Sequence, residues 1–241
     1  MKIAVLTMCI GSNYAKTWES ARLSKEMYCQ RHDYTFIFVG ESLDKDRVAN
    51  WSKIIALQNE LSQYDWIFYS DADAHIMNFD IKLEDIIAEY SQPDKFLIIT
   101  KDNNEINSGN FIIKNDPISH EFLADAYTHF PTKPVSLGEN KGYGIWNDQY
   151  GIYHEYRNEK YASRVSIIPQ NIINAYPCAC CGIKYKTGDL LIHFVNSRRP
   201  THNWTGLADE PWKCIEIAEA KTNLLMAYRE IHKLRNMLQN K

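Results

Sequence analysis

Short runs of apolar residues alternate with amphipathic stretches along most of this chain. The apolar runs that predict β-strands are residues 2–7, 35–39, 65–69, 96–100, 165–168 and 189–195, and residues 107–114 predict a turn that leads into a further strand. The stretches in which apolar residues recur with helical spacing are residues 17–31, 51–61, 81–90 and 119–128. Strands that alternate with helices predict an α/β fold, in which a mostly parallel central sheet is flanked by helices and joined by right-handed crossovers.

The other segments predict one long loop and a C-terminal helix on a single domain, residues 1–241. Residues 130–144 hold two prolines and three glycines without periodicity, which predicts a long mobile loop that shapes or covers a site. Residues 212–239 carry Leu224, Ile231 and Leu238 on one helical face. Such an amphipathic helix predicts packing on the domain, or on a second copy in a homodimer, rather than membrane binding.

Charge, hydropathy and cysteine usage exclude several classes of protein. A net charge of −3 gives no reason to expect nucleic acid as a partner. No stretch approaches the roughly 18 apolar residues of a membrane span, and the start of the chain lacks a signal peptide. The six cysteines predict reduced thiols in a cytoplasmic protein. Cys178, Cys180 and Cys181 leave a thiolate metal site as an alternative, although no second pair of ligands stands at finger-like spacing.

The most informative stretch is the central strand and the acidic triplet Asp71-Ala72-Asp73 that follows it. In extended backbone, side chains two positions apart point the same way, so both carboxylates are predicted to face one point. Paired carboxylates at the carboxyl end of such a strand suit Mg²⁺ or Mn²⁺ that is shared with substrate phosphates. The alternative is a solvated turn after a strand.

A nucleotide is predicted to bind where the first strand ends. The loop there contributes Thr7, Cys9 and Tyr14, although no G-x-G-x-x-G dinucleotide fingerprint follows the strand. Lys53 is a polar residue in the helix before the central strand. It is predicted to lie on the surface, with a phosphate or sugar contact as the alternative.

Six blocks in order along the chain resemble the galactosyl/mannosyl/xylosyl transferase family 34. The blocks are Trp51-Ser-Lys-Ile-Ile-Ala-Leu, Trp66-Ile-Phe-Tyr-Ser-Asp-Ala-Asp-Ala-His-Ile-Met-Asn, Asn107-Ser-Gly-Asn-Phe-Ile-Ile-Lys-Asn, Asp148-Gln149, Ile168-Pro-Gln-Asn-Ile-Ile-Asn-Ala-Tyr and Gly188-Asp-Leu-Leu-Ile-His-Phe. The resemblance runs from about Asn50 to Arg199. The more distant glycogenin-like family 8 shares the acidic triplet and the Asn-Ser-Gly turn, but fits the last two blocks less well.

The resemblance implies a GT-A fold and a metal-dependent, retaining transfer of a hexose or pentose. The donor would be a UDP- or GDP-sugar, and the acceptor a glycan or glycoconjugate that receives an α-linkage. Asp71, Asp73 and His193 would bind Mn²⁺ or Mg²⁺. A divalent cation suits this chemistry because it neutralises the charge that develops on the leaving diphosphate.

The resemblance also implies roles for residues near the donor. Asn107, Ser108 and Gly109 would lie against the donor sugar or the acceptor, and Ala72 between the metal ligands. Asp148 and Gln149 would lie near the donor sugar, with Gln149 on the face opposite the departing phosphate. Arg198 would contact phosphate oxygens. The alternatives are a simple turn at Asn107–Gly109, a helix-capping pair at 148–149 and a solvated basic turn at Arg198.

Two functions of other classes compete with this one. A nucleotidyltransferase also uses paired carboxylates on an α/β sheet, but it needs a basic, glycine-rich N-terminal loop, and residues 9–13 lack basic side chains. A non-catalytic sugar-binding homologue could dispense with the metal ligands, and all three are intact here. The family's usual membrane anchor is also missing, which predicts a cytoplasmic protein rather than one of the Golgi.

Overall fold

The computed structural model describes residues 1–103, 105–128, 147–177, 179 and 182–195, together with positions 220 and 227. Four predictions therefore concern residues that are not described. They are the loop 130–144, the cysteines at 178, 180 and 181, the phosphate contact of Arg198, and nearly all of the helix 212–239.

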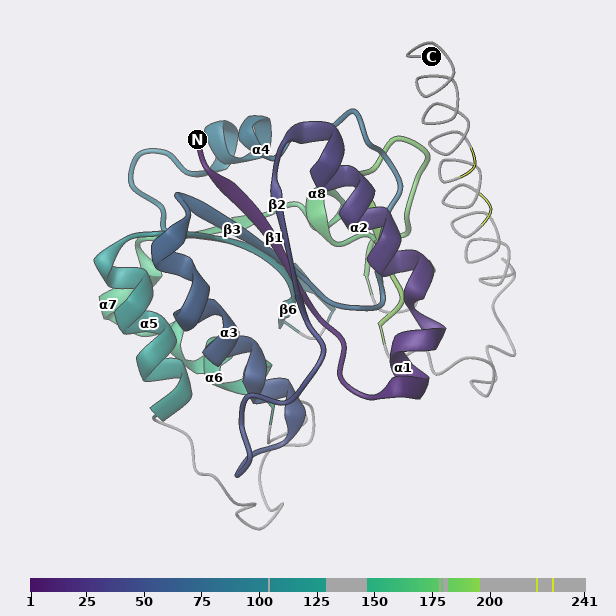
Figure 1. The fold of residues 1–241 in the computed structure, drawn as a ribbon. Helices are drawn as coiled ribbons and strands as arrows, with labels where there is room; N and C mark the ends of the chain where they lie inside the picture. The colour runs from purple at the N-terminus through teal and green to yellow at the C-terminus, as the bar shows by residue number, and fades with distance from the viewer. Residues whose placement is uncertain are drawn as a thin grey trace, which may run out of the picture.

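A six-stranded sheet forms the centre of the molecule (Figure 1). In spatial order its strands are β2 (Thr35–Val39), β1 (Ile3–Met8), β3 (Trp66–Ser70), β6 (Glu105–Lys114), β5 (Leu97–Asp102) and β7 (Val165–Ile168). Strand β1 pairs in parallel with β2 and β3, and β5 pairs in parallel with β7. Only β6 runs antiparallel to its neighbours. The predicted α/β class with a mostly parallel sheet is confirmed.

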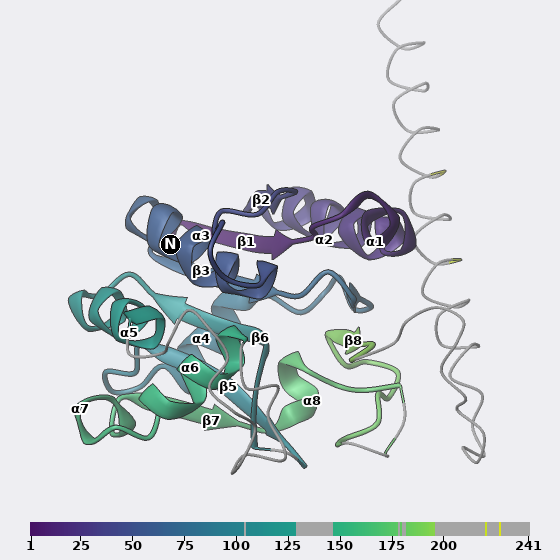
Figure 2. The ribbon, with the colours of Figure 1, turned by 90° about the horizontal axis from the view of Figure 1, so that it is seen from below.

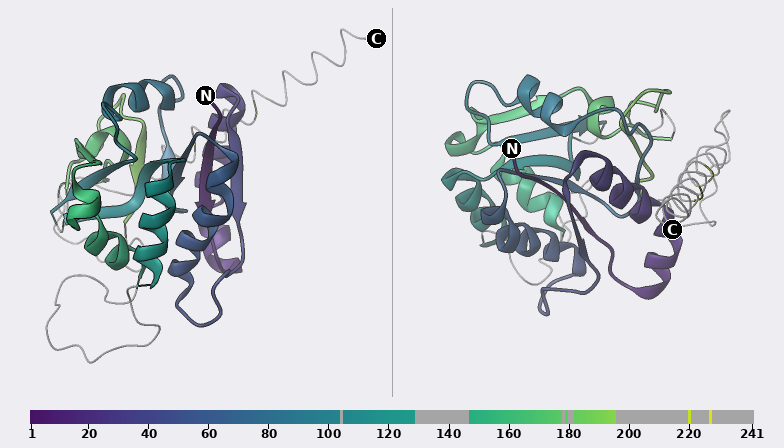
Figure 3. Two further views of the ribbon diagram at one scale, coloured as in Figure 1. Left: turned by 90° about the vertical axis from the view of Figure 1, so that its left-hand side faces the viewer. Right: turned by 45° about the horizontal axis from the view of Figure 1, so that its top comes forward.

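Helices cover both faces of this sheet (Figures 1 and 3). One face is covered by α2 (Glu19–His32), α4 (Leu83–Tyr90) and α8 (Gln170–Ile173). The opposite face is covered by α3 (Ser52–Glu60), α5 (Pro117–Thr128), α6 (Asp148–Glu155) and α7 (Glu159–Ala162). The arrangement is a three-layer sandwich, which is the usual way to bury both faces of a largely parallel sheet.

Alternation of side chains along each strand separates the two hydrophobic cores. On β3, Ile67 and Tyr69 pack with α3 and α5, whereas Trp66 and Phe68 pack with α2 and α4. Every residue of β3 is buried, because successive side chains point to opposite faces and helices cover both. This explains why the strand has no polar position before its carboxyl end.

Several short elements were not predicted from the sequence pattern. The unpredicted strand β4 (Ala74–Ile76) pairs antiparallel with β8 (Leu191–His193), which lies within the strand predicted at residues 189–195, in a separate two-stranded sheet. Figure 2 shows β8 beside α8, at one end of the main sheet. Helix α1 (Ser12–Thr17), α7 and α8 were likewise missed. A strand of three residues and helices of four to six residues contain too few positions for a hydrophobic period to be recognised.

The described residues bear on two further predictions, which concern membrane spans and reduced cysteines. No helix among them combines the length and the apolar character that crossing a membrane requires. Cys9 and Cys29 are both buried and free, in agreement with the reduced thiols predicted for them.

Candidate functional site

The two carboxylates of the acidic triplet converge because the chain turns, not because it is extended. Asp71 and Asp73 lie in the tight connection between β3 and β4, where the Ala74 N–H donates to Asp71 O at 3.1 Å. The Asp71 N–H donates to Gly109 O on β6 at 2.7 Å, which anchors the turn to the neighbouring strand. The prediction of an extended backbone here was wrong, although the prediction that both side chains face one point holds.

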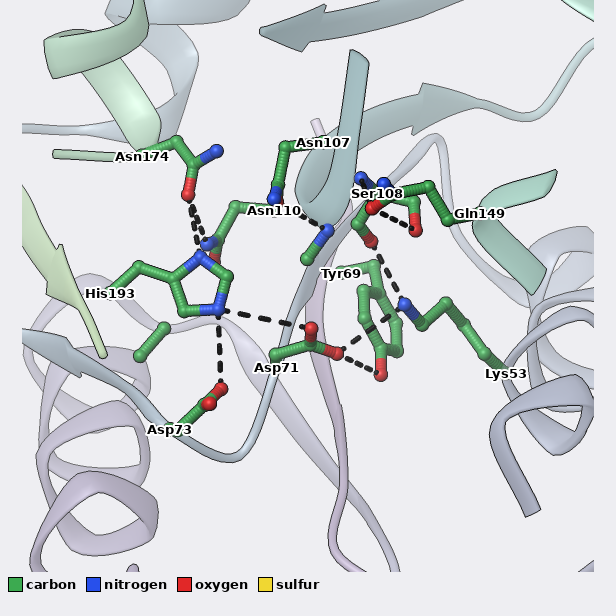
Figure 4. A network of polar contacts seen from close by, with 12 residues as sticks. Lys53, Tyr69, Asp71, Asp73, Asn107, Ser108, Asn110, Gln149, Asn174 and His193 are labelled. Carbon is green, nitrogen blue, oxygen red and sulfur yellow. Dashed lines mark hydrogen bonds and ion pairs between the residues drawn. The ribbon is translucent and has the colours of Figure 1, made fainter. Parts of the chain in front are cut away.

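Strand β8 brings His193 to the same place. His193 lies opposite Ala74 in the β4–β8 pair, and the Phe194 N–H donates to Asp73 O at 2.9 Å. The imidazole Nε2 consequently lies 3.2 Å from Asp73 Oδ1 and 3.9 Å from Asp71 Oδ2 (Figure 4). His193, which is distant in sequence, thus meets Asp71 and Asp73 at one point, as the family resemblance implied.

These three side chains fit a divalent cation such as Mn²⁺ or Mg²⁺. Each offers one ligand atom, and the three atoms lie within 4.8 Å of one another. Ligands about 2.1 Å from one ion can be at most about 4.2 Å apart, so the two distances to His193 Nε2 already suit a shared ion. Two carboxylate oxygens and one imidazole nitrogen form a donor set that Mn²⁺ accepts readily.

Asp71 carries charge interactions on both of its oxygens. Oδ1 accepts the Tyr69 hydroxyl proton at 2.9 Å and lies 3.4 Å from Lys53 Nζ, while Oδ2 faces His193. Although about a third of the Asp71 side chain is exposed, its carboxylate lies among buried groups. Burial raises the pKa of Asp71, Lys53 opposes that rise, and the charge of Asp73 adds to it.

Asn107, Ser108 and Gly109 lie inside strand β6 rather than in a turn, which corrects the local reading of this segment. The pairing of β5 with β6 shifts register here: Ile99 faces Phe111, whereas the next residue, Thr100, faces Asn107. Residues 108–110 therefore bulge out of the β5 ladder. Bulges of this kind re-aim side chains beside active sites, and this one directs Ser108 and Gly109 toward the acidic turn.

Gly109 is required by close packing against two of the three predicted metal ligands, His193 and Asp71. A Cβ atom at this position would lie 2.3 Å from His193 Cε1 and 2.8 Å from Asp71 Oδ2. Both distances are far below van der Waals contact, and the neighbouring side chains are held by hydrogen bonds. Any larger residue at 109 therefore displaces His193 or Asp71.

We expect Gly109→Ala to weaken Mn²⁺ binding by about 10-fold or more, the range seen when groups that support metal ligands are altered. The added methyl group collides with His193, while the fold is anchored elsewhere. Titration of Mn²⁺ by isothermal calorimetry measures the effect. Gly40→Ala is the control, because its Cβ would meet only the ring of the partly exposed Phe38. Equal affinity in both variants would contradict the packing argument.

Lys53 is buried in the site rather than exposed on the surface, which corrects the first reading of this residue. Its Nζ lies 2.7 Å from Asp148 Oδ2 and donates to Ser108 O at 2.9 Å. Burial disfavours the Lys53 charge, but Asp148 and Asp71 outweigh burial, so the pKa of Lys53 is raised. The ammonium group thus links the acidic turn on β3 to the beginning of α6.

Asp148 and Gln149 reach the site from the first turn of α6. The helix begins after Asn147, whose side chain accepts from the Tyr150 N–H and so caps the helix. Asp148 Oδ2 accepts the Ser108 hydroxyl proton at 2.9 Å, and Gln149 Oε1 accepts from the Ser108 N–H at 3.1 Å. Both predicted residues therefore meet the bulge on β6.

A second buried lysine, which was not predicted from the sequence, donates hydrogen bonds to the backbone of the acidic turn. Lys25 on α2 is fully buried and donates to Asp71 O at 2.8 Å and to Ala74 O at 2.6 Å. Burial lowers the pKa of Lys25 to about 8, against the attraction of Asp73 and Asp71. Its helical spacing alone resembles that of a surface lysine, so no local signal distinguished it.

A pocket opens beside the acidic turn at the end of β1. Its volume is about 220 Å³, part of it open to solvent, and it is lined by Thr7, Cys9, Ala15, Trp18, Arg22, Phe38 and Ala72. Thr7, Cys9 and Ala72 were predicted to contact a nucleotide, whereas Trp18, Arg22 and Phe38 were not. Tyr14 lies beside Asp73: burial, together with the charges of Asp73 and Asp71, raises the pKa of its hydroxyl.

Comparison with protein families identifies the chain. The model of the galactosyl transferase GMA12/MNN10 family, a family of glycosyltransferases, matches residues 2–93 and 88–201. The chain belongs to this family. The match includes every site residue described above, and it confirms the resemblance that the six sequence blocks indicated.

Relatives of this galactosyl transferase family member occur in Schizosaccharomyces pombe. An "Alpha-1,2-galactosyltransferase" is 27% identical in an alignment of 210 residues that covers 71% of this chain and 54% of that protein. A "Probable alpha-1,2-galactosyltransferase gmh1" is 23% identical in an alignment of 240 residues that covers 83% of this chain and 70% of that protein. The chain spans about half the length of several of the curated relatives that it matches, 52% and 54% in two cases.

Solved structures share the fold of this galactosyl transferase family member. A glycosyltransferase involved in the glycosylation of the major capsid of PBCV-1 has a TM-score of 0.63 at 12% identity, over 93% of this chain and 100% of that one. The bifunctional glycosyltransferase WbbM has a TM-score of 0.53 at 10% identity, over 82% of this chain and 46% of that one. At such identities the likeness concerns the fold alone, and the predicted GT-A fold is confirmed.

Proposed function

We propose that this protein is a metal-dependent, retaining glycosyltransferase. It transfers a hexose or pentose from a nucleotide-sugar to a hydroxyl group of a glycan or glycoconjugate and forms an α-linkage. Because the relatives in S. pombe are named α-1,2-galactosyltransferases, a galactosyl donor is the first choice within that class. The family membership supports the general activity, and the site residues support the mechanism.

One observation carries the proposal: a charged cluster of side chains and a neutral polar cluster lie next to each other at the carboxyl end of β3. The acidic pair with His193 lies on one side of Gly109, and Gln149 contacts Ser108 on the other. A nucleotide-sugar has the same division, with a charged diphosphate next to a neutral sugar. Such a ligand would place its diphosphate at the acidic turn and its sugar at Ser108.

Asp71, Asp73 and His193 would hold the metal ion. Bound there, Mn²⁺ or Mg²⁺ supplies positive charge for the diphosphate as the glycosidic bond breaks. Lys53, beside the Asp71 carboxylate, and Lys25, bonded to the backbone carbonyl of Asp71, add two positive charges to the acidic turn. Without them, the acidic groups would repel an anionic donor before any ion arrived.

The pocket beside Ala72 suits the nucleoside part of the donor. Its aromatic walls, Trp18 and Phe38, present flat apolar surface, and Arg22 lies over the Phe38 ring. Among the described residues, Thr7 Oγ1 and Trp18 Nε1 are buried without a hydrogen-bond partner. Since buried polar atoms are normally paired, a base with its own donors and acceptors supplies what they lack.

The groups around the sugar support attack from the side that the diphosphate leaves. An inverting enzyme needs a carboxylate or imidazole as general base on the opposite face. Gln149 is an amide and cannot take a proton, while Asp148 is already neutralised by Lys53 at 2.7 Å. The acceptor proton would therefore pass to an oxygen of the departing phosphate. The Gln149 carbonyl, which keeps one lone pair beyond its bond to Ser108, would stabilise the positive charge at the anomeric carbon.

The competing functions have less support. A nucleotidyltransferase would need basic residues in the loop after β1, and residues 9–13 contain none. A non-catalytic sugar-binding protein has no use for a complete set of three convergent ligands.

Screening nucleotide-sugars for metal-dependent hydrolysis and thermal stabilisation tests the proposal. The panel contains UDP-galactose, UDP-xylose and GDP-mannose, each with Mn²⁺, with Mg²⁺ and with a chelator. We expect one donor to be hydrolysed and to raise the melting temperature only when the metal is present. No stabilisation by any nucleotide-sugar would overturn the proposal.

A further inference from the structure

The second ring nitrogen of His193 contacts a buried asparagine that no part of the proposed mechanism uses. His193 Nδ1 lies 2.7 Å from Asn174 Oδ1, on the side of the ring away from the two carboxylates (Figure 4). Asn174 follows α8 and is completely buried. Its sequence block supported the family resemblance, but nothing in the pattern suggested a role for this residue.

The hydrogen bonds around Asn174 place its amide oxygen toward His193. Its Nδ2 donates to Thr100 Oγ1 at 3.0 Å, and its Oδ1 accepts from Asn110 Nδ2 at 3.0 Å. The oxygen therefore faces His193, and an oxygen can only accept. The ring must donate through an Nδ1–H, because two acceptors at 2.7 Å would repel one another.

A proton on Nδ1 leaves the Nε2 lone pair of the neutral ring free. That lone pair faces Asp73 Oδ1 and Asp71 Oδ2, at 3.2 and 3.9 Å. A histidine binds a metal only through an unprotonated nitrogen, and the group bonded to the other nitrogen sets which one that is. In the opposite tautomer, an Nε2–H would point into the place of the ion.

The asparagine is itself held rigidly. The Asn174 N–H donates to Gln170 O at 2.8 Å, and Gln170 Nε2 donates to Asn174 O at 3.0 Å. The His193 N–H donates to Ala175 O at 2.7 Å, so the histidine and the asparagine segment are also joined through their backbones. Thr100 and Asn110 are completely buried and belong to the central sheet.

We infer that Asn174 is a positioning residue, which holds His193 as the Nδ1–H tautomer with Nε2 aimed at the Asp71–Asp73 pair. The inference deepens the proposed function, because it rests on the metal site. It also makes a statement about the metal-free protein: Asn174 holds the proton on Nδ1, in competition with Asp73 Oδ1, which lies 3.2 Å from Nε2 and would accept a proton there.

Two variants separate the accepting oxygen from mere packing. Asn174→Asp keeps an acceptor toward His193, whereas Asn174→Leu keeps similar volume and removes it. Asn171→Leu is the matched control, since Asn171 lies on the same helix and is only partly buried. Mn²⁺ affinity is measured from the free-ion signal in electron paramagnetic resonance. We expect Asn174→Leu to lose about 10- to 100-fold in affinity, and Asn174→Asp and Asn171→Leu to stay within a few-fold of the unmodified protein.

The tautomer is read directly by ¹⁵N NMR of metal-free protein with labelled histidines, at a pH where the ring is neutral. The His193 signals are assigned by their loss in His193→Gln. We expect a protonated Nδ1 in the unmodified protein and in Asn174→Asp, and an increased share of Nε2–H in Asn174→Leu. An Nε2–H ring in the unmodified protein would overturn the inference, whether or not the variants fold.

Two results of the metal titration would also overturn it: equal affinity in Asn174→Leu and the unmodified protein, or an equal loss in Asn174→Asp and Asn174→Leu. A failure of the proposed function is distinguishable from these outcomes. If the unmodified protein binds no Mn²⁺, the metal site is lost as a proposal, yet the NMR result still decides the tautomer.

Discussion

Replacing Asp73 with alanine is expected to lower the rate of sugar transfer by about 100-fold or more, with a melting temperature close to that of the unmodified protein. The activity falls because the carboxylate 3.2 Å from His193 Nε2 is one of three ligands for the ion that offsets the leaving charge. Stability is retained because Asp73 shares its turn with a second carboxylate, and removing one charge relieves repulsion. Steady-state turnover and differential scanning calorimetry measure the two quantities.

The same reasoning predicts that Asp71→Ala and His193→Ala lose most activity, and that a chelator abolishes the activity of the unmodified protein. Added Mn²⁺ should restore it, and Mg²⁺ less fully. Asp80→Ala is the matched control, because this side chain is 79% exposed and pairs only with Arg31 on the surface. Full turnover by Asp73→Ala would end the metal assignment.

The second large effect is expected at Gln149. Gln149→Ala should lower kcat by about 100-fold, the magnitude associated with removing one preorganised dipole from a developing charge. Donor affinity should change little, because the nucleotide and diphosphate bind elsewhere in the proposed site. Gln63→Ala, at an exposed glutamine beyond α3, serves as the control. A rate unchanged by Gln149→Ala would remove the residue from the mechanism.

The stereochemistry of the product provides an independent measurement of the same mechanism. An α-configured nucleotide-sugar should yield an α-linked product, since the described residues offer no general base on the face of Gln149. The coupling constant of the anomeric proton in an NMR spectrum of the product distinguishes the two anomers. A β-linked product from an α-configured donor would overturn both the retaining mechanism and the role of Gln149.

The local pattern of the sequence was sufficient to predict the layers of the fold and the two carboxylates at the centre of the site. Strands 35–39 and 165–168 were predicted with the bounds that β2 and β7 have. The alternation of apolar side chains on a strand depends on neighbours in sequence, so it is visible without a structure. Asp71 and Asp73 could also be placed from the sequence, because they directly follow a recognisable strand. The family resemblance supplied His193, Asp148 and Gln149.

Other features of the site depend on contacts between distant segments. Lys53 looked like a surface residue because its partner Asp148 lies 95 positions later, and burial of a lysine depends on such a partner. The Asn-Ser-Gly segment looked like a turn, since its residues favour turns wherever the sheet does not impose a bulge.

The β4–β8 pair and the hydrogen bond from His193 to Asn174 show the same division most clearly. Both join short segments whose own propensities are weak, and they form only when the rest of the sheet has set their positions. The sequence by itself therefore indicated Asp71, Asp73, His193, Asp148 and Gln149 as candidate site residues. The tertiary structure decided how they are held, because a hydrogen bond or an ion pair between distant segments leaves no periodic trace in the chain.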